Sequence, residues 1–312
     1  MSDLIFARDT RSHPGEGPIN PYHYVPTLWI CALFVALFGL STLIHFGQAF
    51  RFRMWWLIPT ACIAGITEVI GWSGRLWSSK NPTNITPFMI QITTTIIAPT
   101  PLIAANFIIL GKLISRLGPK YSRISGVWYL VIFTSCDIIA LIIQALGGAK
   151  ASVAVDNDED PSTGGNIMLA GIAFQLAAIS LYIILASEFV FRFAYNKPVR
   201  KKPKPGSNGT HYCDTRTKLM IFGLGFSAIA LFIRSVYRTI ELADGWGGRI
   251  ITTQVYFNVL DGGMIVLAMY TLNISHPGFL LIDTPETRRS DDTSDLGLKE
   301  TKGVAPSPSS SS

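Results

Sequence analysis

Seven ionisable side chains lie in or beside long apolar segments of this chain, where a charge is costly. They are Glu68, Arg75, Asp137, Arg234, Arg238, Glu241 and Asp261. A charge at the centre of a bilayer costs about 2.5–3.5 kcal/mol on insertion scales, so such residues face the interior of a helix bundle and pair there. A carboxyl group in that setting can hold a proton or receive a cationic group from a ligand.

Helical spacing groups the first of these residues in pairs. Glu68 and Arg75 are seven positions apart, which places them two turns apart on one helix face. Asp137 and the uncharged Gln144 repeat that spacing in another apolar segment. The spacing therefore predicts two separate helix faces that carry polar groups into the bundle.

The remaining residues come from two later segments. Arg234, Arg238 and Glu241 follow an i, i+4, i+7 pattern and line one stripe of a helix. Glu241 is positioned to pair with Arg238 at i, i+3. Asp261 belongs to the next apolar segment, and we expect it near the middle of the membrane.

The simplest interpretation is a polar cavity or ion-pair network built from four segments. Four carboxyl groups face three guanidinium groups, so one carboxyl group lacks an arginine partner and is either protonated or paired with a cationic ligand. The alternative is a closed network that only fixes the packing of the helices. We predict eight substrate-binding residues: Glu68, Arg75, Asp137, Gln144, Arg234, Arg238, Glu241 and Asp261.

The elements that position these residues are predicted to be transmembrane helices. Of the 312 residues, 49% are hydrophobic and only 15% are charged, whereas a soluble domain carries roughly a quarter charged residues. A helix needs about 20 apolar residues to cross a bilayer, and only helices or closed barrels satisfy their backbone groups in lipid. The expected spans are Pro26–Phe46, Trp55–Gly74, Thr86–Ile114, Gly126–Leu146, Ile167–Phe191, Leu219–Ile240 and Ile251–Ile274.

The distribution of positive charge predicts the topology. Eighteen of the 26 Lys and Arg residues lie in the first, third and fifth loops and the C-terminal segment, and six lie on the opposite side. Because positive loops stay in the cytosol, we expect the N-terminus outside and the C-terminus inside. Residues 1–25 form an extracellular segment, 26–278 a seven-helix membrane domain, and 279–312 a disordered cytosolic tail.

Two loop features have a possible role at the membrane surface. The basic strip 200–205 faces the cytosol, where it acts as a topological anchor or binds anionic lipid headgroups. Asn84 begins an N-glycosylation sequon on the expected outer side, but it lies close to the bilayer, so its modification is left open. The expected partners are membrane lipids or amphiphilic small molecules, not nucleic acid.

Enzyme chemistry has little support in the sequence. The four cysteines form no CxxC pair, and only one of the five histidines, His45, lies within an expected span. Neither a Gly-x-Ser-x-Gly nor a His-Glu-x-x-His motif is present. We therefore predict no catalytic residues, no metal and no cofactor.

Several short motifs occur together in the order found in the fungal RTA-like proteins, or lipid-translocating exporters. Residues 24–278 resemble that family, with one element in each of spans two, four and six and a closing His-Pro-Gly. The matching residues are Glu68, Gly71, Trp72 and Arg75; Phe133, Asp137, Gln144, Gly147 and Gly148; Arg234, Tyr237, Arg238 and Glu241; and Asp261, His276, Pro277 and Gly278. Gln254 departs from the pattern, because a Glu is typical there.

The resemblance implies a plasma-membrane transporter or translocase of amphiphilic lipids, such as sphingoid bases or aminosterols, that gives resistance to toxic amphiphiles. Such molecules join an ammonium group to an apolar body, which suits a carboxyl-rich cavity in lipid. The alternative is a seven-helix lipid sensor, or receptor-like regulator, of membrane lipid asymmetry. Saturable binding without transport would favour that alternative.

Overall fold

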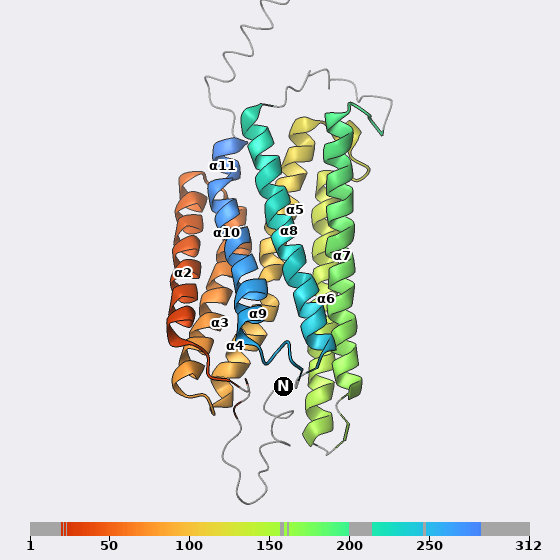
Figure 1. Ribbon diagram of the computed structural model, residues 1–312. Helices are drawn as coiled ribbons and strands as arrows, with labels where there is room; N and C mark the ends of the chain where they lie inside the picture. Colours follow the sequence, from red (N-terminus) through yellow and green to blue (C-terminus); the bar gives the residue numbers. More distant parts are fainter. Residues whose placement is uncertain are drawn as a thin grey trace, which may run out of the picture.

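The computed structural model describes residues 20, 22, 24–156, 159–160, 162–199, 214–245 and 248–281, and in this part of the chain it is all-helical (Figure 1). Seven helical segments in it are long and apolar enough to cross a membrane, which confirms the predicted seven-helix class. They are Leu28–Arg51, Trp55–Lys80, Thr86–Leu117, Gly126–Ala151, Ser162–Ala194, Thr215–Ala243 and Gln254–Leu280.

Four of the spans are single α-helices. They are α2 (Leu28–Arg51), α6 (Gly126–Asp156), α7 (Ser162–Ala194) and α8 (Thr215–Ala243). The second span combines a 3₁₀ turn η1 (Trp55–Leu57), a π-helical turn η2 (Ile58–Cys62) and α3 (Ile63–Lys80). A short 3₁₀ turn, η3 (Pro119–Tyr121), connects the third span to the fourth.

The third and seventh spans are interrupted. The third consists of α4 (Ile85–Ile97) and α5 (Pro99–Leu117), with the break at Ala98, directly before the first of the two prolines that remove backbone donors. The seventh consists of α9 (Gln254–Tyr256), a π-helical stretch η4 (Phe257–Gly263), α10 (Met264–Ile274) and α11 (Pro277–Leu280). π-helical turns occur frequently at functional sites, and η4 contains Asp261.

The bundle has two unequal parts. The hairpin of α6 and α7 packs chiefly on itself and forms one edge of the molecule, while α2 lies at the other (Figure 1). A Cβ atom on Gly164 of α7 would lie 2.3 Å from the backbone nitrogen of Ala151, so the two helices touch through their backbones there. Between these edges, α3 packs against α2 and α4, and α8 packs against α5, α7 and α10.

The outer surface of the bundle suits lipid. Large apolar side chains such as Trp29, Leu43, Phe222 and Ile274 are exposed on the helices, which a soluble protein would avoid over so wide an area. Together with the seven apolar helices, this surface makes the chain an integral membrane protein. Residues 1–19, 21 and 23 of the predicted N-terminal segment 1–25, the basic strip 200–205 and residues 282–312 of the predicted tail 279–312 lie outside the described residues, and the predicted orientation stays a prediction.

Candidate functional site

Five of the eight predicted site residues come together in one buried group, which we call the charged cluster. It consists of Glu68 from α3, Arg234, Arg238 and Glu241 from α8, and Asp261 from η4. Each of these residues is at most 7% exposed. Because unpaired charges are costly in that setting, the partners of each group decide what the cluster can do.

Arg234 and Asp261 join α8 to the seventh span. The Nε atom of Arg234 lies 2.9 Å from Oδ1 of Asp261, and the same guanidinium group donates a hydrogen bond to the backbone carbonyl of Thr95 on α4. Gly262 lets η4 approach α3 closely, since a Cβ atom there would lie 2.4 Å from the ring of Trp72. One guanidinium group thus connects three spans at the level of the π-helical turn.

A second ion pair lies within α8. Arg238 donates to Oε2 of Glu241, as the i, i+3 spacing predicts, and the hydroxyl of Tyr237 donates to Oε1 of Glu241 at 2.8 Å. Both carboxylate oxygens of Glu241 are therefore occupied. Tyr237 and Arg238 bond to different oxygens of this carboxylate.

Glu68 is the member of the cluster without a partner of its own. It is fully buried, and neither carboxyl oxygen accepts a hydrogen bond of regular geometry from any described residue. The charged groups that act on it are Asp261, Arg234 and Arg238, and the indole N–H of Trp72, one turn further along α3, lies within hydrogen-bonding range of its carboxyl group. The two arginines already have carboxylate partners in Asp261 and Glu241. The cluster thus holds one carboxyl group more than its guanidinium groups neutralise.

Arg75 lies outside the charged cluster, in a cage of aromatic rings. Its guanidinium carbon lies 4.5 Å from the ring centre of Phe257 and 5.2 Å from that of Tyr22, and the rings of Trp72 and Tyr24 are also within reach. It donates to the hydroxyl of Tyr24 at 2.6 Å. No carboxylate pairs with Arg75 among the described residues, so cation–π contacts and neutral acceptors stabilise this charge.

The segment before the first span closes the Arg75 cage. The hydroxyl of Tyr22 donates to Oε1 of Gln91 at 2.9 Å, and that oxygen also accepts from Arg75 at 3.4 Å. Burial raises the pKa of Tyr22 to about 12, although Arg75 opposes the shift. The hydroxyl therefore stays protonated and remains a donor at physiological pH.

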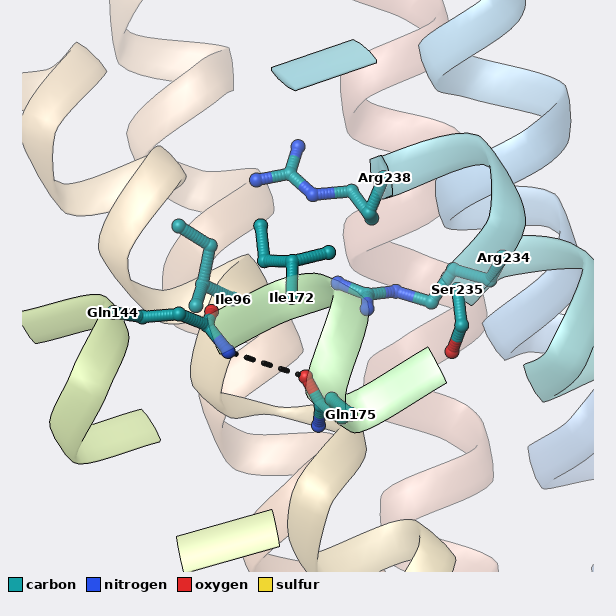
Figure 2. A pocket seen from close by; sticks show the side chains of 7 residues that line it. All are labelled: Ile96, Gln144, Ile172, Gln175, Arg234, Ser235 and Arg238. Carbon is teal, nitrogen blue, oxygen red and sulfur yellow. Dashed lines mark hydrogen bonds between the residues drawn. The ribbon is translucent and has the colours of Figure 1, made fainter. Parts of the chain in front are cut away.

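Asp137 and Gln144 of α6 form a separate polar group with Gln175 of α7. The amide of Gln144 donates to Oε1 of Gln175 at 3.4 Å, and the Gln175 side chain also lies within hydrogen-bonding range of Asp137. Figure 2 shows Arg234 and Arg238 reaching from α8 towards this pair of amides. A cavity of about 10 Å³ separates them, which is room for about one water molecule.

A larger hollow lies on the outside of α8, between this helix and the seventh span. It measures about 540 Å³ and is mostly apolar, and we call it the lipid-facing groove. Its lining residues are Phe232, Ile233, Val236, Tyr237, Ile240, Arg249, Ile250, Tyr256 and Leu260. Ile240 is 49% exposed, so the groove opens to the surface of the bundle. Tyr237 forms part of its wall and also donates to Glu241, which joins the groove to the charged cluster.

The structure thus brings five predicted residues together and separates Arg75. It sets Gln144 across a small cavity from Arg234 and Arg238, with Asp137 two turns away on α6. Sequence reasoning did not assign Tyr22, Tyr24 and Phe257 to the site, although they cage Arg75. The signal for Tyr22 and Tyr24 was an aromatic pair directly before the first span, which looks like an ordinary interfacial belt, whereas nothing local links Phe257 of the seventh span to Arg75. Among the described residues, no three His, Cys, Asp or Glu side chains are placed to hold a metal ion.

The comparisons with known proteins agree with one another. The family model described as RTA1 like protein matches residues 61–284. The sphingoid long-chain base transporter RSB1 of Saccharomyces cerevisiae is 30% identical over 278 residues, covering 82% of this chain and 72% of the relative. Protein RTA1 of the same yeast is 26% identical over 281 residues, covering 82% of this chain and 84% of the relative. No solved structure matches.

Proposed function

This chain belongs to the RTA1-like protein family, and from that premise we propose that it is a transporter or translocase of amphiphilic lipids that carry a cationic head, such as sphingoid bases or aminosterols. The relative RSB1 is named as a transporter of sphingoid long-chain bases. A sphingoid base joins a long alkyl chain to an ammonium group. The site must therefore offer an apolar surface open to lipid and a buried negative group beside it.

The lipid-facing groove supplies the apolar surface. Its volume of about 540 Å³ lies within the usual range of ligand sites. Burying an alkyl chain contributes about 0.8 kcal/mol for each CH₂ group that leaves water, but the chain is already in lipid here. The groove therefore guides and orients the tail more than it stabilises the bound state.

The charged cluster supplies the negative groups. Tyr237 separates the groove from Glu241 and donates a hydrogen bond to it. An ammonium group that displaces this hydroxyl would pair with Glu241 and place its tail in the groove. The contact between groove and cluster through Tyr237 is the observation that carries the proposal.

A flip assay in liposomes tests the function. We expect the purified protein to accelerate the movement of a fluorescent sphingoid base between leaflets, compared with protein-free liposomes. Ile233→Trp puts a larger side chain into the groove and should slow this movement about tenfold. Overpacking of the groove raises the free energy of the state with a bound lipid tail by about 1–3 kcal/mol. The control is Ile229→Trp, one turn away on α8, where Ile229 is exposed but does not line the groove. No acceleration by the unmodified protein would contradict the proposal.

A lipid sensor is the second candidate, and the closed state of the cluster favours it. The cavity beside Arg234 and Arg238 holds about one water molecule, and the two ion pairs are sealed from solvent. A sensor would bind the same cationic amphiphiles saturably without moving them. Binding in the absence of any flip activity would therefore support the sensor against the transporter.

We propose that the protein lies in the plasma membrane with its N-terminus outside the cell. We propose no catalytic step. In cells, loss of the protein should increase sensitivity to an added sphingoid base.

A tag at each terminus, probed in intact and permeabilised cells, tests the orientation. Staining of the C-terminal tag in intact cells would overturn it. The basic strip 200–205 would then face outwards, and its proposed contact with anionic cytosolic lipid would fall as well.

A further inference from the structure

The unmatched carboxyl group of the charged cluster leads to an inference that rests on the proposed function. Arg234 pairs with Asp261 and Arg238 pairs with Glu241, so these four charges cancel. Glu68 is left over, fully buried and without a hydrogen-bond donor of regular geometry among the described residues. An ionised carboxylate in that position would be a net negative charge inside the membrane.

Among the residues that the structure describes, the surroundings of Glu68 offer no other cation to neutralise it. Asp261 faces it from η4, and Arg234 and Arg238 face it from α8. The helix α4 contains no charged residue, and α2 contains only His45 and Arg51, both near its far end. On α5 the charged residues Lys112 and Arg116 also lie near the far end, and on α3 itself Arg75 is enclosed by its aromatic cage.

We propose that Glu68 is a proton-binding site and that the protein exchanges one proton from Glu68 for one cationic amphiphile head. In the resting cluster Glu68 carries the proton, so the net charge is zero. When an ammonium group pairs with Glu241, Arg238 loses its partner and becomes available to Glu68. The O–H bond of Glu68 then breaks, the proton leaves to water, and the carboxylate pairs with Arg238.

The exchange is favoured because it keeps the net charge of the cluster at zero before and after the ammonium group binds. One positive charge enters with the ammonium group and one leaves with the proton. Arg238 acts on both carboxyl groups, since it bonds to Glu241 and lies within electrostatic reach of Glu68. A cavity with room for about one water molecule lies beside Arg238, although Glu68 itself does not line it.

Proton release on binding tests the exchange. The protein in lipid nanodiscs is titrated with a long-chain trimethylammonium compound in weak buffer that contains a pH dye, with empty nanodiscs as the blank. This probe carries no exchangeable proton, so any proton released comes from the protein. We expect about one proton for each probe bound, and an apparent affinity that rises up to tenfold for each pH unit.

Two variants separate the possible outcomes. Glu68→Gln keeps the size of the side chain and should bind the probe more weakly and without releasing a proton, because Arg238 then has no carboxylate to pair with. Glu188→Gln, at an ion pair with Arg123 and Arg192 on the other end of the bundle, should behave like the unmodified protein. Binding without release by the unmodified protein, or release that persists in Glu68→Gln, overturns the exchange but leaves the proposed function intact. No binding of any cationic amphiphile would overturn the proposed function itself.

An infrared comparison tests the resting proton without a ligand. The unmodified protein should show the carbonyl stretch of a protonated carboxylic acid, and Glu68→Gln should lack that component. Equal spectra in this region would contradict a proton on Glu68 even if binding cannot be measured. Size-exclusion profiles of the two proteins confirm that the variant is folded.

Discussion

The α3–α8–η4 region and the α6–α7 hairpin both bury acidic side chains, but they surround them differently. Asp261 lies 2.9 Å from a guanidinium nitrogen of Arg234, and Glu241 pairs with Arg238. Asp137 on α6 has only the neutral amide of Gln175 within hydrogen-bonding range. The helices also pack differently, because the hairpin packs chiefly on itself while α8 contacts α5, α7 and α10. Charge is therefore concentrated where several spans meet.

Substitution of a buried acidic residue should therefore have different consequences for stability in the two regions. Removing one partner of a buried ion pair leaves an uncompensated charge, which costs about 3–5 kcal/mol. Removing the charge of an acid without an arginine partner leaves no such charge behind. Substitutions in the two regions should therefore separate the energetics of the ion pairs from those of simple helix packing.

The largest effect is expected from Asp261→Asn. The substitution keeps the side-chain size but leaves Arg234 without its carboxylate, and Glu68 can replace that carboxylate only by giving up its proton, so we expect a loss of about 3 kcal/mol in the free energy of unfolding. Thermal unfolding in detergent should show a clear fall in melting temperature. The double variant with Arg234→Met should recover most of the loss, since it removes the unpaired charge. If Asp261→Asn alone is as stable as the unmodified protein, the ion pair is not what holds α8 to η4.

A smaller effect is expected in the hairpin from Gly164→Ala. The new Cβ atom would lie 2.3 Å from the backbone nitrogen of Ala151, so α6 and α7 must move apart, at a cost of about 1–3 kcal/mol. Gly165→Ala is the matched control, because its Cβ atom meets nothing within 4 Å. The control should be neutral or slightly stabilising, since alanine favours a helix over glycine. Unfolding of the two variants at the same midpoint would show that the backbone contact carries no stability.

The smallest effect on stability is expected from Asp137→Asn. An amide can keep a hydrogen bond to Gln175, and no arginine loses a partner, so the change should stay below about 1 kcal/mol. The same unfolding measurement checks it beside Asp261→Asn. A loss as large as that of Asp261→Asn would mean that Asp137 has a charged partner after all, and the contrast between the two regions would fail.

Much of the arrangement could be predicted from local patterns. Long apolar runs predict seven helices, and the spacing of Arg238 and Glu241 predicts their pair, because both depend only on helical geometry. The break at Ala98 follows from the prolines beside it. The sequence also predicts that Arg234 and Asp261 belong to one network, because both are ionisable residues in apolar spans, and the structure pairs them.

The remaining features depend on contacts between distant segments. Arg75 follows the same helix face as Glu68, yet the side chains of Tyr24 and Phe257 enclose it, and no local spacing links those residues. The groove is likewise formed by α8 and the seventh span together, through residues such as Ile233 and Tyr256. Such sites are formed by tertiary packing. A single sequence contains their residues but does not show which of them contact one another.

The proposed function requires that a cationic head meets Glu241 while its tail lies in the lipid-facing groove. The most direct measurement compares flip rates of a long-chain amine and the alcohol of equal chain length in liposomes that contain the protein. We expect the unmodified protein to move the amine faster, and Glu241→Gln to slow the amine about tenfold, equivalent to about 1.4 kcal/mol, while the alcohol is unchanged. Equal rates for the amine and the alcohol, or an amine rate that Glu241→Gln leaves unaltered, would contradict the claim.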